Sequence, residues 1–168
     1  MDFNSIFLEV LKNKRNPTKW DKSKFENIKL IPNTQVGQVG QEFMVKVCEK
    51  IGFDYNEPEG TQSPWDIKIK NVTFEIKAAT EDVSGNFQFN HIRYHRSYDA
   101  LICIGISPEM ISFNCWTAAE VKTGKAGNLV TMEKGANASF KLTKKKSDLF
   151  SFSKIIDKLN RVISAVRS

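Results

Sequence analysis

Apolar and polar residues alternate around Asn71 in the pattern of two short strands joined by a tight turn. Residues 67–69 and 72–76 each alternate with a period of two, as half-buried strands do. Asparagine tolerates a left-handed backbone, so Asn71 and the lysine before it are predicted to form a two-residue turn. In that register Asp66 faces Glu75, and the apolar side chains of both strands share the opposite face.

The polar face of this hairpin places two acids side by side. Directly opposed strand residues have Cβ atoms roughly 5 Å apart, so ionised Asp66 and Glu75 would repel each other. Mg²⁺ neutralises such a pair, because it prefers oxygen ligands and is commonly held by one or two carboxylates. Lys77 shares their face and can hold an attacking water or stabilise charge on a phosphate. An ordinary hairpin with a solvated polar face is the alternative, and the spacing does not separate the two.

The remaining periodicity predicts an α/β single domain spanning residues 1–168. Helices are expected at 2–13, 34–51, 117–121 and 152–166, strands at 100–106 and 111–116, and loop and hairpin structure at 124–142. Residues 100–106 form a continuous apolar run, which is typical of a central strand buried on both faces.

The helix predicted over 34–51 has a defined apolar stripe and end signals. Asn33 or Thr34 is the expected cap, and Gly52 is the expected stop. Gly37 and Gly40 permit close packing or close approach of a phosphate backbone. The stripe consists of Val36, Val39, Phe43, Val47 and Ile51.

Composition narrows the partners and the compartment. The net charge of +6 and the pI near 9.2 favour a polyanionic partner without identifying it. Cys48, Cys103 and Cys115 are odd in number and widely spaced, which indicates buried reduced thiols. No apolar run is long enough to span a membrane and no signal peptide is recognised, so we expect a cytoplasmic protein. The glycines before position 41 lack a phosphate-loop pattern, so no nucleotide cofactor is expected.

Residues 87–97 are predicted to be helical or irregular and carry side chains suited to DNA. Amides and guanidinium groups can make paired hydrogen bonds to base edges, and histidine or arginine can contact phosphate. A solvated polar face is equally compatible with the pattern. A zinc site at His91 and His95 is disfavoured, because no cysteine or acid partners have a recognisable spacing. The candidate DNA-facing residues are Gln88, Asn90, His91, Arg93 and Arg96.

The run Lys144-Lys145-Lys146 is interpreted as a solvated charge run, with phosphate contact as the alternative.

Asp66, eight intervening residues and then Glu75-Ile76-Lys77 resemble the motif of the PD-(D/E)XK nucleases. Pro64-Trp65-Asp66 stands for the first half, although Trp65 separates a proline and an acid that are adjacent in the ideal motif. The resemblance extends over residues 34–120, and this stretch is similar in particular to small type II restriction endonucleases.

This resemblance implies a restriction-endonuclease-like core, in which helices flank a central mixed β-sheet, and hydrolysis of DNA phosphodiester bonds. Asp66 and Glu75 would bind Mg²⁺, for which Mn²⁺ can substitute, together with the carbonyl of Ile76. Lys77 would orient or activate the attacking water, and Glu42 would add an outer or second-metal contact. Such a metal polarises the phosphoryl oxygen and lowers the pKa of bound water.

Three functions remain open. The first is a sequence-specific restriction endonuclease acting on double-stranded DNA as a homodimer, whose two-fold symmetry matches a palindromic target. The second is a junction-resolving or repair nuclease that uses the same site. The third is a basic nucleic-acid-binding module whose acid cluster is not catalytic.

Overall fold

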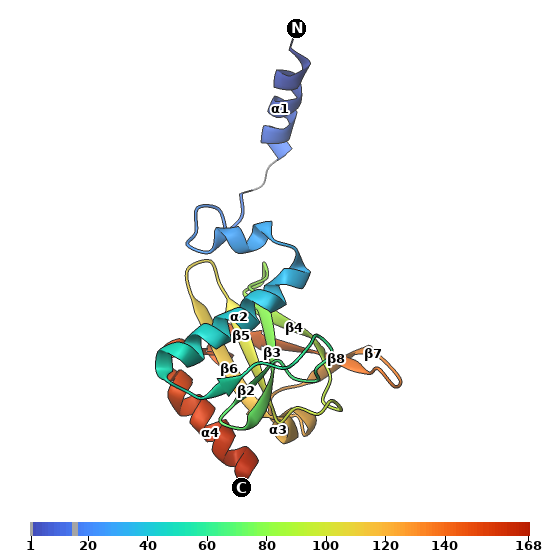
Figure 1. The fold of residues 1–168 in the computed structure, drawn as a ribbon. Coiled ribbons are helices and arrows are strands. Elements are labelled where there is room, and N and C mark those ends of the chain that lie inside the picture. Colours follow the sequence, from blue (N-terminus) through green and yellow to red (C-terminus); the bar gives the residue numbers. More distant parts are fainter. Residues whose placement is uncertain (1, 15–16) are drawn as a thin grey trace.

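The computed structural model describes residues 2–14 and 17–168, and a six-stranded mixed sheet forms its centre (Figure 1). The central strands β3 and β5 are parallel, and the other neighbours are antiparallel. In spatial order the strands are β1 (Tyr55–Asn56), β2 (Ile67–Ile69), β3 (Val72–Thr80), β5 (Ala100–Ile106), β6 (Ile111–Thr117) and β9 (Phe150–Ser151). Every residue of β5 is buried, as its apolar run predicts.

The β2–β3 hairpin has the register predicted from the sequence, with Ile67 opposite Phe74. Lys70 and Asn71 both have positive φ angles, 48° and 67°, as the central residues of a type I′ turn require. The apolar face of the hairpin is buried and its polar face is partly exposed. The local pattern therefore fixes this element and the side to which its acids point.

Helices cover one face of the sheet. The helix α2 (Asn33–Ile51) packs on β2 and β3, and α4 (Ile155–Arg167) packs on β6. These helices and the sheet share one buried apolar cluster. The predicted α/β class, with a central mixed sheet flanked by helices, is confirmed.

A second, three-stranded antiparallel sheet covers the other face. Its strand order is β4 (Asn86–Ile92), β8 (Ser139–Lys145) and β7 (Leu129–Glu133). Phe87 and Phe89 of β4 and Leu142 of β8 lie in one buried cluster with Leu101 and Cys103 of β5. The hairpin expected within residues 124–142 is confirmed as β7–β8, and it projects from the body in Figure 1.

The prediction of helical or irregular structure for residues 87–97 is wrong for residues 87–92, which belong to strand β4, whereas residues 93–97 are irregular. In β4, the apolar residues Phe87 and Phe89 alternate as in a strand, but the ladder with β8 shifts register between Phe89 and Ile92. His91 lies at this irregularity with a φ of 57°, in the left-handed region. The bulge breaks the period of two, and the pattern consequently does not reveal the strand.

The helix α2 is rotated relative to its predicted apolar stripe. Its buried residues are Val36, Gly40, Met44 and Cys48, whereas Val39 is exposed. A Cβ at Gly40 would lie 2.8 Å from Cβ of Ala78, so this glycine allows α2 to approach β3 closely. The close contact, rather than the largest apolar residues, sets which side of the helix faces the sheet.

The ends of α2 agree with the sequence only in part. Gly52 ends the helix in the left-handed conformation, as predicted, with a φ of 73°. The predicted cap at Asn33 or Thr34 is wrong, because Pro32 occupies the cap position and makes no side-chain cap bond.

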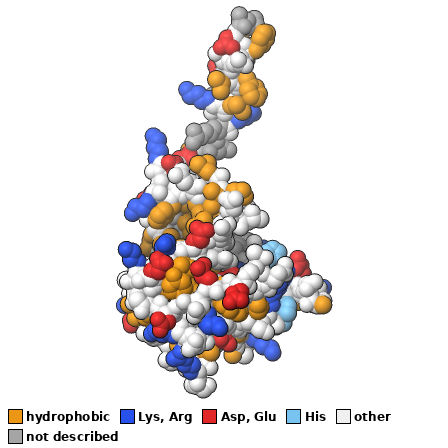
Figure 2. All heavy atoms as spheres, in the orientation of Figure 1, with side chains coloured by type: hydrophobic (Ala, Val, Ile, Leu, Met, Phe, Trp, Pro, Cys, Tyr) orange, Lys and Arg blue, Asp and Glu red, His pale blue; other side chains and the backbone are white. Residues whose placement is uncertain are grey.

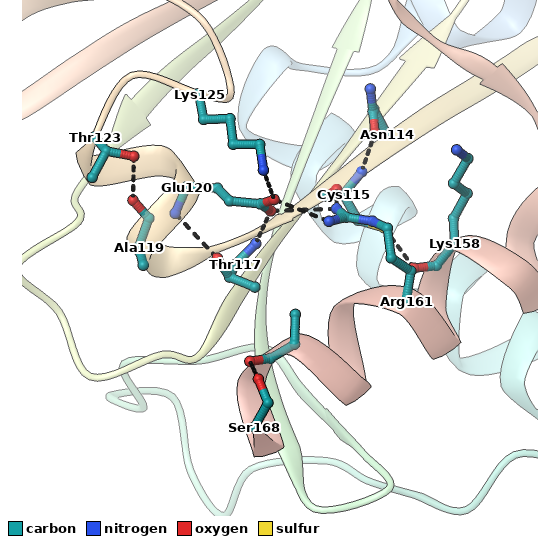
Figure 3. A network of polar contacts seen from close by, with 11 residues as sticks. Asn114, Cys115, Thr117, Ala119, Glu120, Thr123, Lys125, Lys158, Arg161 and Ser168 are labelled. Carbon is teal, nitrogen blue, oxygen red and sulfur yellow. Dashed lines mark hydrogen bonds and ion pairs between the residues drawn. The ribbon is translucent and has the colours of Figure 1, made fainter.

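A polar network joins the C-terminal helix to the sheet (Figure 3). The short helix α3 (Ala118–Lys122) begins with a capping box in which Thr117 and Glu120 bond to each other's backbone N–H. Arg161 of α4 donates to Glu120 Oε1 and to the carbonyl of Cys115, each at 3.0 Å. The network therefore links α3, α4 and β6.

The N-terminal helix α1 (Phe3–Lys14) confirms the helix expected there, and its apolar side chains are exposed. Phe3, Phe7 and Leu8 are all more than 60% exposed. Figure 1 shows the helix apart from the body, and Figure 2 shows its apolar side chains at the surface.

Two expectations from composition have counterparts in the structure. The three cysteines are buried free thiols, as predicted. Within residues 2–14 and 17–168, no helix combines the length and the apolar character needed to cross a membrane.

Candidate active site

A cleft of about 560 Å³ opens between the N-terminal half of α2 and strand β4, with β3 between them. The hairpin acids Asp66 and Glu75 line it, together with Ile76 and Lys77. Gln88, Asn90 and His91 line it from β4. The structure thus brings seven residues singled out in the sequence to one cavity.

Asp66 is held at the end of the hairpin by backbone hydrogen bonds. Its own N–H donates to the carbonyl of Phe74 over 2.8 Å. The N–H of Ile76 donates to Asp66 Oδ2, also over 2.8 Å. These bonds extend the pairing by one residue beyond β2 and keep the Asp66 carboxylate beside Glu75.

The environment of Asp66 disfavours its charge. Desolvation by burial, followed by the neighbouring Glu75 carboxylate, raises the pKa of Asp66 to about 6. The N–H of Ile76 and the charges of Lys77 and Arg96 act in the opposite direction without cancelling this rise. A cation bound beside Asp66 would therefore stabilise the ionised form of its carboxyl group.

Lys77 lies within reach of the same acids. Its Nζ is 3.0 Å from Glu75 Oε1, and both side chains are largely shielded, with exposures of 22% and 15%. The lysine is therefore oriented by an ion pair at the wall of the cleft rather than free to sample solvent. It is the ammonium group that the alternation of β3 predicts next to the acids.

Gln41, and not Glu42, contacts the hairpin from α2. Gln41 Nε2 donates to Asp66 Oδ1 over 2.8 Å. Glu42 is exposed, accepts a hydrogen bond from Gln38 and does not line the cleft. The placement of Glu42 at the site, which the resemblance implies, is wrong. Gln41 faces the cleft, and the next residue on a helix is turned away by about 100°.

Two of the five candidate DNA-facing residues lie outside the cleft lining. Arg93 forms an ion pair with Glu133 of β7, with Nη2 and Oε2 3.2 Å apart. Arg96 is exposed in the segment after β4, near enough to Asp66 to lower its pKa. His95, also exposed, follows the strand, so it does not share a helical face with His91.

His91 adopts a backbone conformation that residues with a Cβ rarely use. Its N–H donates to Met132 Sδ of β7 over 3.4 Å, so the bulge is anchored to the neighbouring hairpin. Both Asn90 and His91 line the cleft at this point. The bulge thus directs two consecutive polar side chains to the site, which a regular strand cannot do.

Asp82 is a cleft residue that the sequence pattern does not single out. Its carboxylate accepts hydrogen bonds from the N–H groups of Ser84 and Asn86 and from the side chain of Gln88. The Asp-x-Ser-Gly-Asn spacing of a turn closed by an aspartate is the only local signal for it. Its oxygens are already used in shaping the turn before β4.

The donor set of the cleft fits a hard cation with few protein ligands. In the described part of the chain, no group of three or more His, Cys, Asp and Glu residues is arranged to hold a metal. Asp66 and Glu75 are adjacent, partly desolvated and matched by a single lysine. Such a pair suits Mg²⁺, which usually keeps several waters and takes only one or two carboxylates from the protein.

Comparisons with known proteins add a likeness to solved structures. No protein-family model matches the chain, and no curated protein matches it. Among solved structures, the fold is similar to that of a bacterial homing endonuclease, I-Ssp6803I, with a TM-score of 0.45 and 13% sequence identity. The match covers 68% of this chain and 78% of the other. A likeness at this level carries no conclusion about activity, which has to be argued from the cleft residues.

Proposed function

We propose that the cleft hydrolyses DNA phosphodiester bonds with Mg²⁺ as cofactor, as the resemblance to the PD-(D/E)XK nucleases implies. The observation that carries this proposal is the pair of adjacent carboxylates, Asp66 and Glu75, beside Lys77 in one cleft. Burial and the neighbouring Glu75 carboxylate raise the pKa of Asp66, so a bound cation would favour the ionised form of this acid.

Asp66, Glu75 and the carbonyl of Ile76 would hold the metal ion, with Mn²⁺ as a substitute for Mg²⁺. When bound, such an ion polarises a phosphoryl oxygen and lowers the pKa of a coordinated water. The hydrogen bonds from Gln41 and Ile76 fix the orientation of the Asp66 carboxylate before any ion arrives. A carboxylate that is already held in position binds a metal ion more tightly than the same group in a mobile loop.

Lys77 would orient the attacking water and stabilise negative charge that develops on the phosphate. Its ammonium group is held at 3.0 Å from Glu75, so it lies beside the carboxylates and needs little reorganisation. The role does not require Lys77 to lose its proton, because a charged donor stabilises the transition state electrostatically.

DNA is the substrate class that the surroundings favour. The net charge of +6 attracts a polyanion, and Gln88, Asn90 and His91 line the same cleft as the acids. A sequence-specific, restriction-type enzyme acting as a homodimer is the most specific form of the proposal. Junction-resolving or repair activity would use the same chemistry on a different DNA shape.

The test is cleavage of supercoiled plasmid DNA with Mg²⁺, followed by mapping of the ends on a long sequenced DNA. We expect Asp66→Asn and Glu75→Gln to abolish cleavage and to weaken Mn²⁺ binding measured by calorimetry. Glu49→Gln is the matched control, since Glu49 is an acid at the far end of α2 bonded to Tyr55. Full cleavage by both site variants would disprove the proposal. DNA binding by the wild type without any metal binding would favour the non-catalytic module instead.

A further inference from the structure

The three consecutive lysines 144–146, of which the first two end β8 and the third follows it, have three different environments. Lys144 Nζ lies 5.0 Å from the centre of the Trp116 ring, on the inner side of the three-stranded sheet. Lys146 forms an ion pair of 3.0 Å with the buried Glu81. Lys145 is exposed and lies directly opposite Asn86 of β4. The sequence run is therefore not one charged patch, and only its middle residue belongs to the outer surface.

The strand register extends this outer surface across two strands. Gln88 of β4 pairs with Thr143 of β8, and both are exposed. Lys141 has the same orientation as Thr143 and Lys145, because side chains on a strand repeat every second residue. We call Gln88, Asn90, Lys141, Thr143 and Lys145 the outer face.

The side chains of the outer face have the chemistry of a surface that binds and reads DNA. Lys141 and Lys145 make no ion pair with any residue in 2–14 or 17–168, so their charge is available to an external anion. Asn90 carries an amide, which can pair with the N6 and N7 atoms of adenine, and Thr143 carries a hydroxyl. Gln88 donates through Nε2 to Asp82, and its amide oxygen can accept a hydrogen bond from a base.

The outer face is continuous with the candidate active site. Gln88 and Asn90 belong to the outer face and also line the cleft that contains Asp66 and Glu75. A DNA backbone bound at the acids would therefore have the outer face beside it. The β7–β8 hairpin continues the same sheet beyond the body, as Figure 1 shows.

The dimensions favour the major groove of B-form DNA. Paired strands lie about 4.8 Å apart, and the major groove, about 12 Å wide, admits a two-stranded ribbon. The corresponding groove of duplex RNA is deep and too narrow for side chains to read. Residues 143–145 of β8 pair with β4 and lie beyond the residues of β8 that pair with β7. This part of the three-stranded sheet therefore has the width of a two-stranded ribbon, which the groove of DNA admits and that of duplex RNA does not.

We propose that the outer face enters the major groove of the DNA whose backbone lies in the cleft. Lys141 and Lys145 contact phosphates, and Gln88, Asn90 and Thr143 contact base edges. The inference rests on the proposed function for the position of the DNA, and it adds which surface selects the sequence.

The first experiment measures binding of a fluorescent DNA duplex to the full chain in EDTA, which prevents metal-dependent cleavage. In Lys141→Gln/Lys145→Gln, the slope of log affinity against log salt should fall by about 2, because each lost phosphate contact removes close to one unit. Lys141→Arg/Lys145→Arg keeps the charge and should retain the wild-type slope. The matched control is Lys50→Gln/Lys154→Gln, which removes two exposed lysines of the helical layer and should leave the slope unchanged.

An equal loss of slope in both glutamine pairs, or no loss in the first pair, would overturn the inference. Equal or tighter binding of a duplex RNA would also overturn it, because the face would then not be reading a B-form groove.

The second experiment selects bound duplexes from a pool of random sequence. Asn90→Ala and Thr143→Val should relax the base preference at particular positions while the salt slope stays at the wild-type value. An unchanged preference in both variants would contradict base reading by the outer face.

Cleavage assays distinguish a failure here from a failure of the proposed function. If the wild type does not cut DNA with Mg²⁺ but the two lysine pairs still differ in binding, the nuclease proposal fails and the outer face stands. If the wild type cuts and Lys141→Gln/Lys145→Gln binds and cuts equally well, the outer face fails and the nuclease stands.

Discussion

Glu120 and Asp66 are both partly buried carboxylates beside the same sheet, and their environments shift their ionisation in opposite directions. Burial opposes the charge of Glu120, but hydrogen bonds from Arg161 and from the N–H of Thr117 outweigh it and lower the pKa of Glu120 to about 2. Burial opposes the charge of Asp66 as well, and Glu75 adds to that effect, so the pKa of Asp66 rises to about 6. Both acids accept backbone hydrogen bonds, and they differ in how far burial is offset by neighbouring positive charge.

The comparison separates an acid whose charge is balanced by protein groups from one that we propose binds a cation. Arg161 binds Glu120 through two nitrogens, at 3.0 and 3.3 Å, and Lys125 lies 3.4 Å away. That cluster, drawn in Figure 3, is complete without any ligand. The pair formed by Asp66 and Glu75 has one lysine for two carboxylates and opens into a cleft. Uncompensated charge in a cleft is a physical reason to expect a ligand, which for these acids is a cation.

The largest difference between the two clusters should appear in the rate of DNA cleavage when the lysine of each cluster is removed. Lys77→Met should lower the rate of DNA cleavage with Mg²⁺ by roughly 10²–10³-fold, because a preorganised donor to the developing charge is lost. Lys125→Met removes an ammonium group at a similar distance from a carboxylate and should leave the rate unchanged. Single-turnover cleavage of plasmid DNA measures both rates. Equal rates for the two variants would remove the distinction between the clusters.

The next effect is on stability, and it should have opposite signs in the two clusters. Glu120→Gln should lower the free energy of unfolding by about 1–2 kcal/mol, since it weakens charged hydrogen bonds to Arg161. Asp66→Asn should leave it unchanged or raise it. The asparagine oxygen can still accept from the N–H of Ile76, its NH2 can donate to Gln41 Oε1 once the Gln41 amide turns round, and the repulsion from Glu75 is lost. Urea unfolding at neutral pH without metal measures both. A larger loss in Asp66→Asn than in Glu120→Gln would contradict the comparison.

The pH dependence of these two variants provides an internal control. The folded pKa of Asp66, about 6, lies above its ordinary value of 3.8, so wild-type stability falls as pH rises through this window. The advantage of Asp66→Asn should therefore grow between pH 4 and 6 to roughly 2 kcal/mol or less, after allowance for solvent screening. The folded pKa of Glu120 lies below its ordinary 4.5, so the penalty of Glu120→Gln should shrink as pH falls from 4.5 towards 2.

The acids of the site could be predicted from the sequence because their arrangement is local. The turn at Asn71 and the alternation on either side of it fix which residues oppose each other, and the structure has that register. Asp66, Glu75 and Lys77 then share a face by the geometry of a strand alone. No distant contact is needed to bring these three side chains together.

The remaining parts of the site depend on contacts between segments far apart in the chain. The bulge at His91 interrupts the alternation of β4, so the local sequence resembles neither a regular strand nor a helix. A contact with Met132 of β7, about 40 residues away in the chain, holds the bulge in place. The rotation of α2 follows from the contact between Gly40 and Ala78 of β3. The apolar pattern predicts that Val39 is buried, although it is exposed. The pattern does not show that Gly40 packs closely on β3. The resemblance implies Glu42 at the site, and the apolar pattern does not single out Gln41, which donates to Asp66.

The smallest effect is expected from Gly40→Ala. This variant tests whether the close packing of α2 on β3 contributes to the difference between the pKa values of Asp66 and Glu120. Gly40→Ala would place a Cβ 2.8 Å from the Cβ of Ala78, so the helix must move and Gln41 should withdraw from Asp66. We expect a net loss of about 1 kcal/mol in the free energy of unfolding, despite the better helix propensity of alanine. The pKa of Asp66 should rise further as it loses the hydrogen bond from Gln41, and that of Glu120 should not change.

Gly37→Ala is the matched control on the same helix. A Cβ at Gly37 meets no heavy atom within 4 Å, so alanine should stabilise α2 by up to about 1 kcal/mol and leave the Asp66 pKa at its wild-type value. Urea unfolding and NMR titration of the side-chain carboxyl carbons measure both quantities. If Gly40→Ala leaves the Asp66 pKa unchanged, the hydrogen bond from α2 does not tune the acid, and desolvation and Glu75 alone set the contrast with Glu120.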